Sequence, residues 1–109
     1  MAYYLCMNTL VEKHMGELAV LARRYGVSRL DIFGSAVTEK FEAEHSDLDF
    51  LVEFVAAPPP GGMAHAYFGL LHELESVFER PVDLVTDRSI KNPYFRQSVD
   101  ASRQPVYVS

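Results

Sequence analysis

The sequence has a single cysteine, no tryptophan and no long apolar run. Cys6 has no second cysteine to pair with, which excludes an internal disulfide and a cysteine-based zinc cluster and favours a reducing compartment, by default the cytoplasm. A membrane span needs about 18 continuous apolar residues, and no segment approaches that length. We therefore expect a soluble protein that has no membrane partner.

Basic residues are also scarce, because 10 Lys and Arg face 15 Asp and Glu and leave a net charge of -5. Proteins that bind long DNA or RNA cluster Lys and Arg, which neutralise phosphates and release their counterions. The acidic balance therefore argues against a long nucleic acid as the main partner.

The length and composition fit one small folded unit. A chain of 109 residues that is 49% hydrophobic and 23% charged can bury one core but not two. We expect a single domain over residues 1–109. Residues 1–7 are expected to form a loose extension, because Asn8 or Thr9 can cap the first helix.

The periodicity of apolar residues predicts alternating helices and strands. Helical spacing predicts helical segments at residues 9–25, 36–41, 64–80 and 94–102, and Asn92 is expected to be the N-cap of the last one. Alternating apolar and polar residues predict strands at residues 27–33, 48–54 and 82–86 and an edge strand at 106–108. Prolines and glycines predict a loop at residues 56–62. This order predicts an α/β (α+β) fold, a small mixed sheet with helices packed on one face.

Two aspartates stand at the start of the strand predicted at residues 48–54. Alternate residues of a strand point to the same face, so Asp47 and Asp49 project together and away from the apolar side. Carboxylates this close repel each other unless a cation lies between them. Their hard oxygens suit Mg²⁺ or Mn²⁺. The pair therefore indicates a divalent metal site.

A third acid is placed to join this pair. Asp83 lies between two apolar residues of a predicted strand, so its carboxylate is expected on the polar face of the sheet. If that strand neighbours the one that carries Asp47 and Asp49, the three acids converge on a pair of metal ions. Two metal ions held in this way stabilise the attacking and the leaving oxygen in phosphoryl transfer.

Gly34 and Ser35 supply a candidate phosphate site. A glycine lets the main chain approach a phosphate, and Ser35 adds a hydroxyl and an N–H at the start of a helical turn. Each feature alone has a commoner structural role, because strand-edge acids are usually solvated, glycines make turns and serines cap helices. Their combination favours a functional site.

The stretch FGSAVTEKFEAEHSDLDFLVEF, with VDLV downstream, resembles the minimal nucleotidyltransferases of the DNA polymerase β superfamily. The tail DRSIKNPYFRQSVDASRQPVYVS is similar to that of MNT antitoxins encoded beside HEPN ribonuclease toxins. The resemblance implies a polymerase β-like palm. It also implies functional roles for Gly34 and Ser35 on the nucleotide phosphates and for Asp47, Asp49 and Asp83 as catalytic metal ligands.

One departure from the family pattern concerns the charge that follows Gly-Ser. Many relatives carry an arginine and a glycine there, whereas Lys40 is the first basic residue in this sequence. Either Lys40 replaces that charge in nucleotide binding, or triphosphate binding is weakened.

The resemblance implies an enzyme that uses Mg²⁺ or Mn²⁺ to transfer AMP, or another NMP, from ATP to a hydroxyl. It implies that the acceptor is a tyrosine of a HEPN toxin and that the protein acts as the antitoxin. The alternative is an antitoxin that neutralises its toxin by binding alone. Magnesium-dependent ATP binding separates the two hypotheses. The preferred base, the number of NMP units and the formation of a homo-oligomer are left open.

Overall fold

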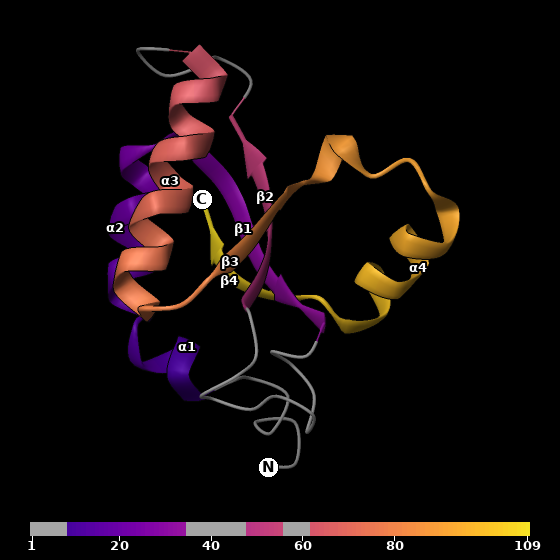
Figure 1. Cartoon of the computed structure of the whole chain (residues 1–109), viewed down its shortest axis with the longest axis horizontal. Coiled ribbons are helices and arrows are strands. Elements are labelled where there is room, and N and C mark those ends of the chain that lie inside the picture. The colour runs from indigo at the N-terminus through magenta and orange to yellow at the C-terminus, as the bar shows by residue number, and fades with distance from the viewer. Residues whose placement is uncertain (1–8, 35–47, 56–61) are drawn as a thin grey trace.

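The computed structural model describes residues 9–34, 48–55 and 62–109 (Figure 1). Its helices are α1 (Thr9–Lys13), α2 (Met15–Arg24), α3 (Gly62–Phe78) and α4 (Pro93–Ser102). Its strands are β1 (Val27–Phe33), β2 (Leu48–Phe54), β3 (Val82–Thr86) and β4 (Gln104–Val108), and a 3₁₀ turn, η3 (Asp87–Ser89), follows β3. The helical turn predicted at residues 36–41, most of the loop predicted at 56–62 and the extension at 1–7 lie outside the described residues.

The strands form one mixed sheet in the order β3-β2-β1-β4. Strand β1 runs antiparallel to both β2 and β4, whereas β2 and β3 are parallel. The predicted bounds of the first three strands are confirmed, and the predicted edge strand starts two residues earlier, at Gln104. The predicted mixed α/β fold is therefore confirmed.

The main core lies between one face of the sheet and helices α1, α2 and α3, which Figure 1 shows on the same side. Strands β1, β2 and β3 contribute alternate residues to this core, as the strand period requires. The buried members from β1, β2 and β3 include Leu30, Ile32, Leu48, Phe50, Val52, Val82 and Leu84. Those from the helices include Val11, Leu18, Leu21, Ala22, Leu70, Leu74 and Phe78.

Helix α4 lies on the opposite face of the sheet, which corrects the prediction that the helices pack on one face (Figure 1). Its buried residue Val99 packs against Phe33 of β1 and Leu51 of β2. The physical reason is that both inner strands carry an apolar residue on this face too. Those residues need a cover, and a helix with one narrow apolar stripe supplies it.

The ends of the helices differ in detail from the predictions. The helix predicted at residues 9–25 is interrupted at His14, whose ring packs edge-on against Phe78 at 5.1 Å and whose Nδ1 lies 2.7 Å from Glu17 Oε1. Helix α3 stops at Phe78, two residues before the predicted end, because Glu79 adopts a left-handed φ of 52°. The predicted N-cap Asn92 is confirmed, since its side chain accepts hydrogen bonds from two main-chain N–H groups of α4.

None of the helices within residues 9–34, 48–55 and 62–109 has the length and apolar character to cross a membrane.

Candidate active site

The parallel pairing of β2 and β3 brings two of the predicted acids together. Asp49 and Asp83 are register partners on these neighbouring strands, which in a sheet lie about 4.8 Å apart. Both side chains leave the face opposite the main core, because the residues that follow them, Phe50 and Leu84, are buried in it. Asp83 is exposed and Asp49 is half-buried. The condition set by the sequence, that the two strands be neighbours, is therefore met.

Gly34 lies against one of these acids. The residue before it, Phe33, is the register partner of Asp49, so β1 ends beside that carboxylate. Gly34 has a left-handed φ of +69°, and a Cβ added to it would lie 2.7 Å from Asp49 Oδ2. A side chain at this position is therefore both strained and obstructed. The geometry requires glycine here.

The other predicted site residues, Ser35, Lys40 and Asp47, lie outside the described residues. Among the residues that the structure describes, no group of three or more His, Cys, Asp or Glu side chains could hold a metal ion. The pair of Asp49 and Asp83 still fits magnesium by its chemistry, because proteins commonly hold Mg²⁺ with one or two carboxylates plus substrate phosphates.

Replacing Gly34 with alanine is expected to destabilise the fold by about 1–2 kcal/mol, because the new Cβ meets Asp49 Oδ2 and the φ is left-handed. Urea denaturation measures this change. Gly16→Ala is the matched control in α2, where a Cβ meets no heavy atom of the described residues within 4 Å. It is expected to be neutral or to stabilise the protein by up to about 1 kcal/mol. Equal losses from both substitutions would contradict the close approach.

Helix α3 fixes edge strand β3 on both sides of Asp83. The Tyr67 hydroxyl donates a hydrogen bond to the main-chain carbonyl of Leu84, and the Val82 N–H donates to Glu75 Oε2 at 3.3 Å. Burial, with a further contribution from the negative charge of Asp83, raises the pKa of Tyr67. The hydroxyl therefore keeps its proton and remains a donor. This support was not predicted, since apolar spacing predicted only the helix that carries Tyr67.

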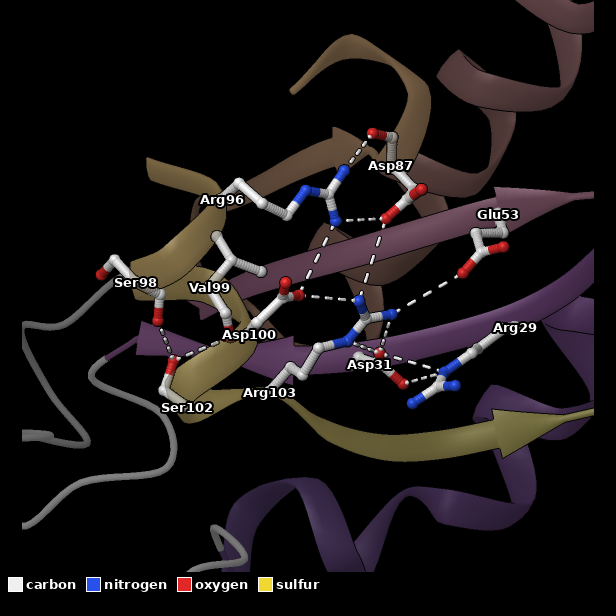
Figure 2. A network of polar contacts seen from close by, with 10 residues as sticks. All are labelled: Arg29, Asp31, Glu53, Asp87, Arg96, Ser98, Val99, Asp100, Ser102 and Arg103. Atoms are coloured by element: carbon white, nitrogen blue, oxygen red, sulfur yellow. Dashed lines mark hydrogen bonds and ion pairs between the residues drawn. The ribbon is translucent and has the colours of Figure 1, made fainter. Parts of the chain in front are cut away.

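Asp31 of β1 is a buried charged residue that the sequence analysis did not single out (Figure 2). Its side chain is 0% exposed, and among the described residues it is the only charged side chain that is fully buried. Its carboxylate accepts hydrogen bonds from Arg29 Nε at 3.0 Å and from Arg103 Nε at 2.6 Å. The available signal was a charged residue between two apolar residues of a strand.

Arg103, directly after α4, forms ion pairs with four acidic residues (Figure 2). Besides Asp31, its guanidinium lies 3.1 Å from Asp100, 3.6 Å from Glu53 and 3.9 Å from Asp87. Burial alone would lower the pKa of Arg103, but hydrogen bonds to Asp31 and Asp100 outweigh it and raise that pKa above its usual value. The side chain is therefore a permanent cation that ties α4 to the sheet.

A cavity of about 200 Å³ lies at the other end of the β2-β3 pair. It is lined by Val52, Glu53, Phe54, Met63, Thr86 and Arg88. These residues belong to the C-terminal ends of the two strands and to the segments beside them, whereas Asp49 and Asp83 stand near the N-terminal ends. The cavity is therefore separate from the acids and Gly34.

Comparison with known proteins assigns the family. The nucleotidyltransferase domain family matches residues 18–106, which include Gly34, Asp49 and Asp83. The chain belongs to this family. Two proteins of Methanocaldococcus jannaschii provisionally named as protein adenylyltransferases, MJ1379 and MJ0128, are 35% and 36% identical to it over 81 residues. In both, the match covers 74% of this chain and 78% of the relative.

Solved structures agree with this assignment. A structure provisionally described as a minimal nucleotidyltransferase is 29% identical, covers 91% of this chain and 96% of its own, and has a TM-score of 0.69. The MNT antitoxin in complex with a tri-AMPylated HEPN toxin of Shewanella oneidensis is 21% identical, with a TM-score of 0.61 and coverages of 91% and 73%. At that identity the second likeness shows the fold alone. The predicted resemblance to minimal nucleotidyltransferases is confirmed.

Proposed function

We propose that this nucleotidyltransferase domain uses Mg²⁺ or Mn²⁺ to move AMP from ATP to a hydroxyl group. The observation that carries the proposal is the register of Asp49 with Asp83 beside the left-handed Gly34. In this proposal Asp47, Asp49 and Asp83 hold the metal. Gly34, Ser35 and Lys40 contact the phosphates.

Charge explains why these acids would serve a metal. ATP is strongly anionic, so two carboxylates on one sheet face would repel its phosphates unless a divalent cation lay between them. When bound, the metal neutralises charge on the triphosphate and stabilises the charge that develops on the leaving pyrophosphate. Because Asp49 is half-buried against Gly34, an ion bound to its carboxylate would lie close to the main chain.

The acceptor is expected to approach Asp83, because that side chain is exposed at the edge of the sheet. In the transfer, the acceptor oxygen forms a bond to the α-phosphorus while the bond from that phosphorus to pyrophosphate breaks. The hydroxyl proton leaves with help from Asp83, which orients or accepts it. The products are an AMP ester of the acceptor and pyrophosphate.

We further propose that the acceptor is a tyrosine of a HEPN toxin and that the domain acts as its antitoxin. Two observations support this choice. The relatives from Methanocaldococcus jannaschii carry a provisional name as protein adenylyltransferases, and the similar MNT antitoxin was solved with an AMPylated HEPN toxin. The net charge of -5 disfavours a long nucleic acid as acceptor.

Incubating the domain with its HEPN partner, ATP and Mg²⁺ is expected to add AMP to a tyrosine of that partner, as measured by mass spectrometry of its peptides. Replacing ATP with α,β-methylene-ATP is the control, because its carbon bridge cannot be cleaved at the α-phosphorus. Replacing the modified tyrosine with phenylalanine should remove the adduct. If the partner is neutralised without any adduct, the hypothesis of AMP transfer is wrong, and the hypothesis of an antitoxin that acts by binding alone is favoured.

A further inference from the structure

One face of α4 contacts the C-terminal end of β1 and the residue after it, Gly34. Residues Phe95, Val99 and Ser102 are four and three positions apart, so they share one face of the helix. The ring of Phe95 meets Phe33 edge-on with the ring centres 6.1 Å apart, and Val99 is buried against Phe33. At the end of this stripe, the Gly34 N–H donates a hydrogen bond to Ser102 Oγ at 3.0 Å.

The orientation of the Ser102 hydroxyl is defined by the helix itself. Ser102 Oγ lies 3.3 Å from Ser98 O and 3.5 Å from Val99 O, so the hydroxyl donates its hydrogen to these main-chain carbonyls of the preceding turn. A hydroxyl that donates to its own helix presents its lone pairs elsewhere, and here one of them receives the Gly34 N–H. This amide lies beyond the last register pair of β1 with β2, so it needs such a partner.

A second contact anchors the same part of α4. Arg103, the residue after Ser102, donates to the buried Asp31 at 2.6 Å. Two consecutive residues therefore contact Asp31 of β1 and Gly34, the residue that directly follows this strand. Asp49 also packs closely against Gly34, because its Oδ2 would lie 2.7 Å from a Cβ added at Gly34. Gly34 is thus held between the hydroxyl of α4 and a proposed metal ligand.

We propose that Ser102 is a positioning residue that holds Gly34 in the conformation that receives the nucleotide phosphates. The inference rests on the proposed function, and it assigns to α4 a role beyond covering the sheet. Ser102 acts through Gly34 and leaves the acids intact. Loss of the Ser102 hydroxyl is therefore expected to weaken nucleotide binding more than it slows AMP transfer by the nucleotide-bound protein.

Ser102→Ala is expected to raise the Kd for α,β-methylene-ATP with Mg²⁺ about five- to twentyfold, because it leaves the Gly34 amide without its partner. Isothermal titration calorimetry on the full chain measures this change. The rate of AMP transfer at saturating ATP should fall less than the affinity. Ser102→Thr keeps a hydroxyl and should stay within about twofold of the wild-type protein.

Ser98→Ala is the matched control, since Ser98 is an exposed serine of the same helix that contacts Ser102 through its main-chain carbonyl. It should leave the Kd unchanged. Amide hydrogen exchange at Gly34, followed by NMR without nucleotide, should become faster in Ser102→Ala and not in Ser98→Ala. If Ser102→Ala fails to fold, Ser102→Cys provides the same comparison with a weak acceptor.

The outcomes separate this inference from the proposed function. If the wild-type protein binds the nucleotide and Ser102→Ala binds it equally well, the positioning role is wrong and the proposed function stands. If the wild-type protein binds no nucleotide while Gly34 exchange still depends on Ser102, the contact is structural and the proposed function fails. A weaker Kd together with faster exchange, restored by Ser102→Thr, supports the inference.

Discussion

Asp49→Asn is expected to abolish AMP transfer, with a loss of at least about a hundredfold. Changing a residue that merely orients a metal ligand costs about 10- to 100-fold, and loss of a ligand should cost more. Mg²⁺ and α,β-methylene-ATP are expected to raise the Tm of the wild-type protein, because a ligand stabilises only the state that binds it, and the same substitution should remove this rise. Without ligand the variant is expected to keep its fold, since asparagine removes the repulsion between Asp49 and Asp83.

Glu12→Gln is the control for charge. It also removes one negative charge, but Glu12 is exposed on α1, which packs into the core on the opposite face of the sheet through Val11. Its transfer rate and its response to nucleotide should match those of the wild-type protein. A wild-type response to Mg²⁺ and nucleotide in Asp49→Asn would show that the metal site lies elsewhere.

Arg103→Ala is expected to lower the free energy of unfolding by about 3 kcal/mol, because it leaves the fully buried Asp31 without its closest cation. For a domain of this size the corresponding fall in Tm is roughly 10 °C or more. Urea denaturation and thermal denaturation give the two values. Arg29 remains beside Asp31, but 40% of its side chain is exposed, so solvent weakens its interaction.

Two further variants test this explanation. Arg88→Ala removes an exposed arginine of η3 and should change the free energy of unfolding by less than about 0.5 kcal/mol. The double variant Asp31→Leu/Arg103→Met removes both charges of the pair and should recover part of the lost stability, because desolvation of the pair is then avoided. An effect of Arg103→Ala no larger than that of Arg88→Ala would mean that the ion pair contributes little.

Local sequence patterns predicted the elements well where one face of each element is buried. The strands at residues 27–33, 48–54 and 82–86 have their predicted bounds, because a period of two is visible in a short window. The helix boundaries were less accurate. The break at His14 and the end at Phe78 depend on the packing of His14 against Phe78 and on the left-handed Glu79, which apolar spacing does not encode.

The candidate site was predicted only in part. The acids Asp49 and Asp83 and the glycine Gly34 were named from their residue types and their positions in predicted strands. Whether the acids meet depended on the pairing of β2 with β3, which joins positions 34 residues apart in the sequence. The buried Asp31 was missed because its partner Arg103 is 72 residues away.

By itself, the sequence determined the strands, the capping of α4 at Asn92 and the resemblance that led to the nucleotidyltransferase family, because each of these depends on residues close together in the chain. Only the tertiary structure decided that Asp49 faces Asp83, that α4 covers the second face of the sheet and that Ser102 holds Gly34. Register and helix placement follow from burying the apolar residues on both faces of the sheet at once. That requirement involves residues from the whole chain, so a local sequence pattern cannot predict how it is met.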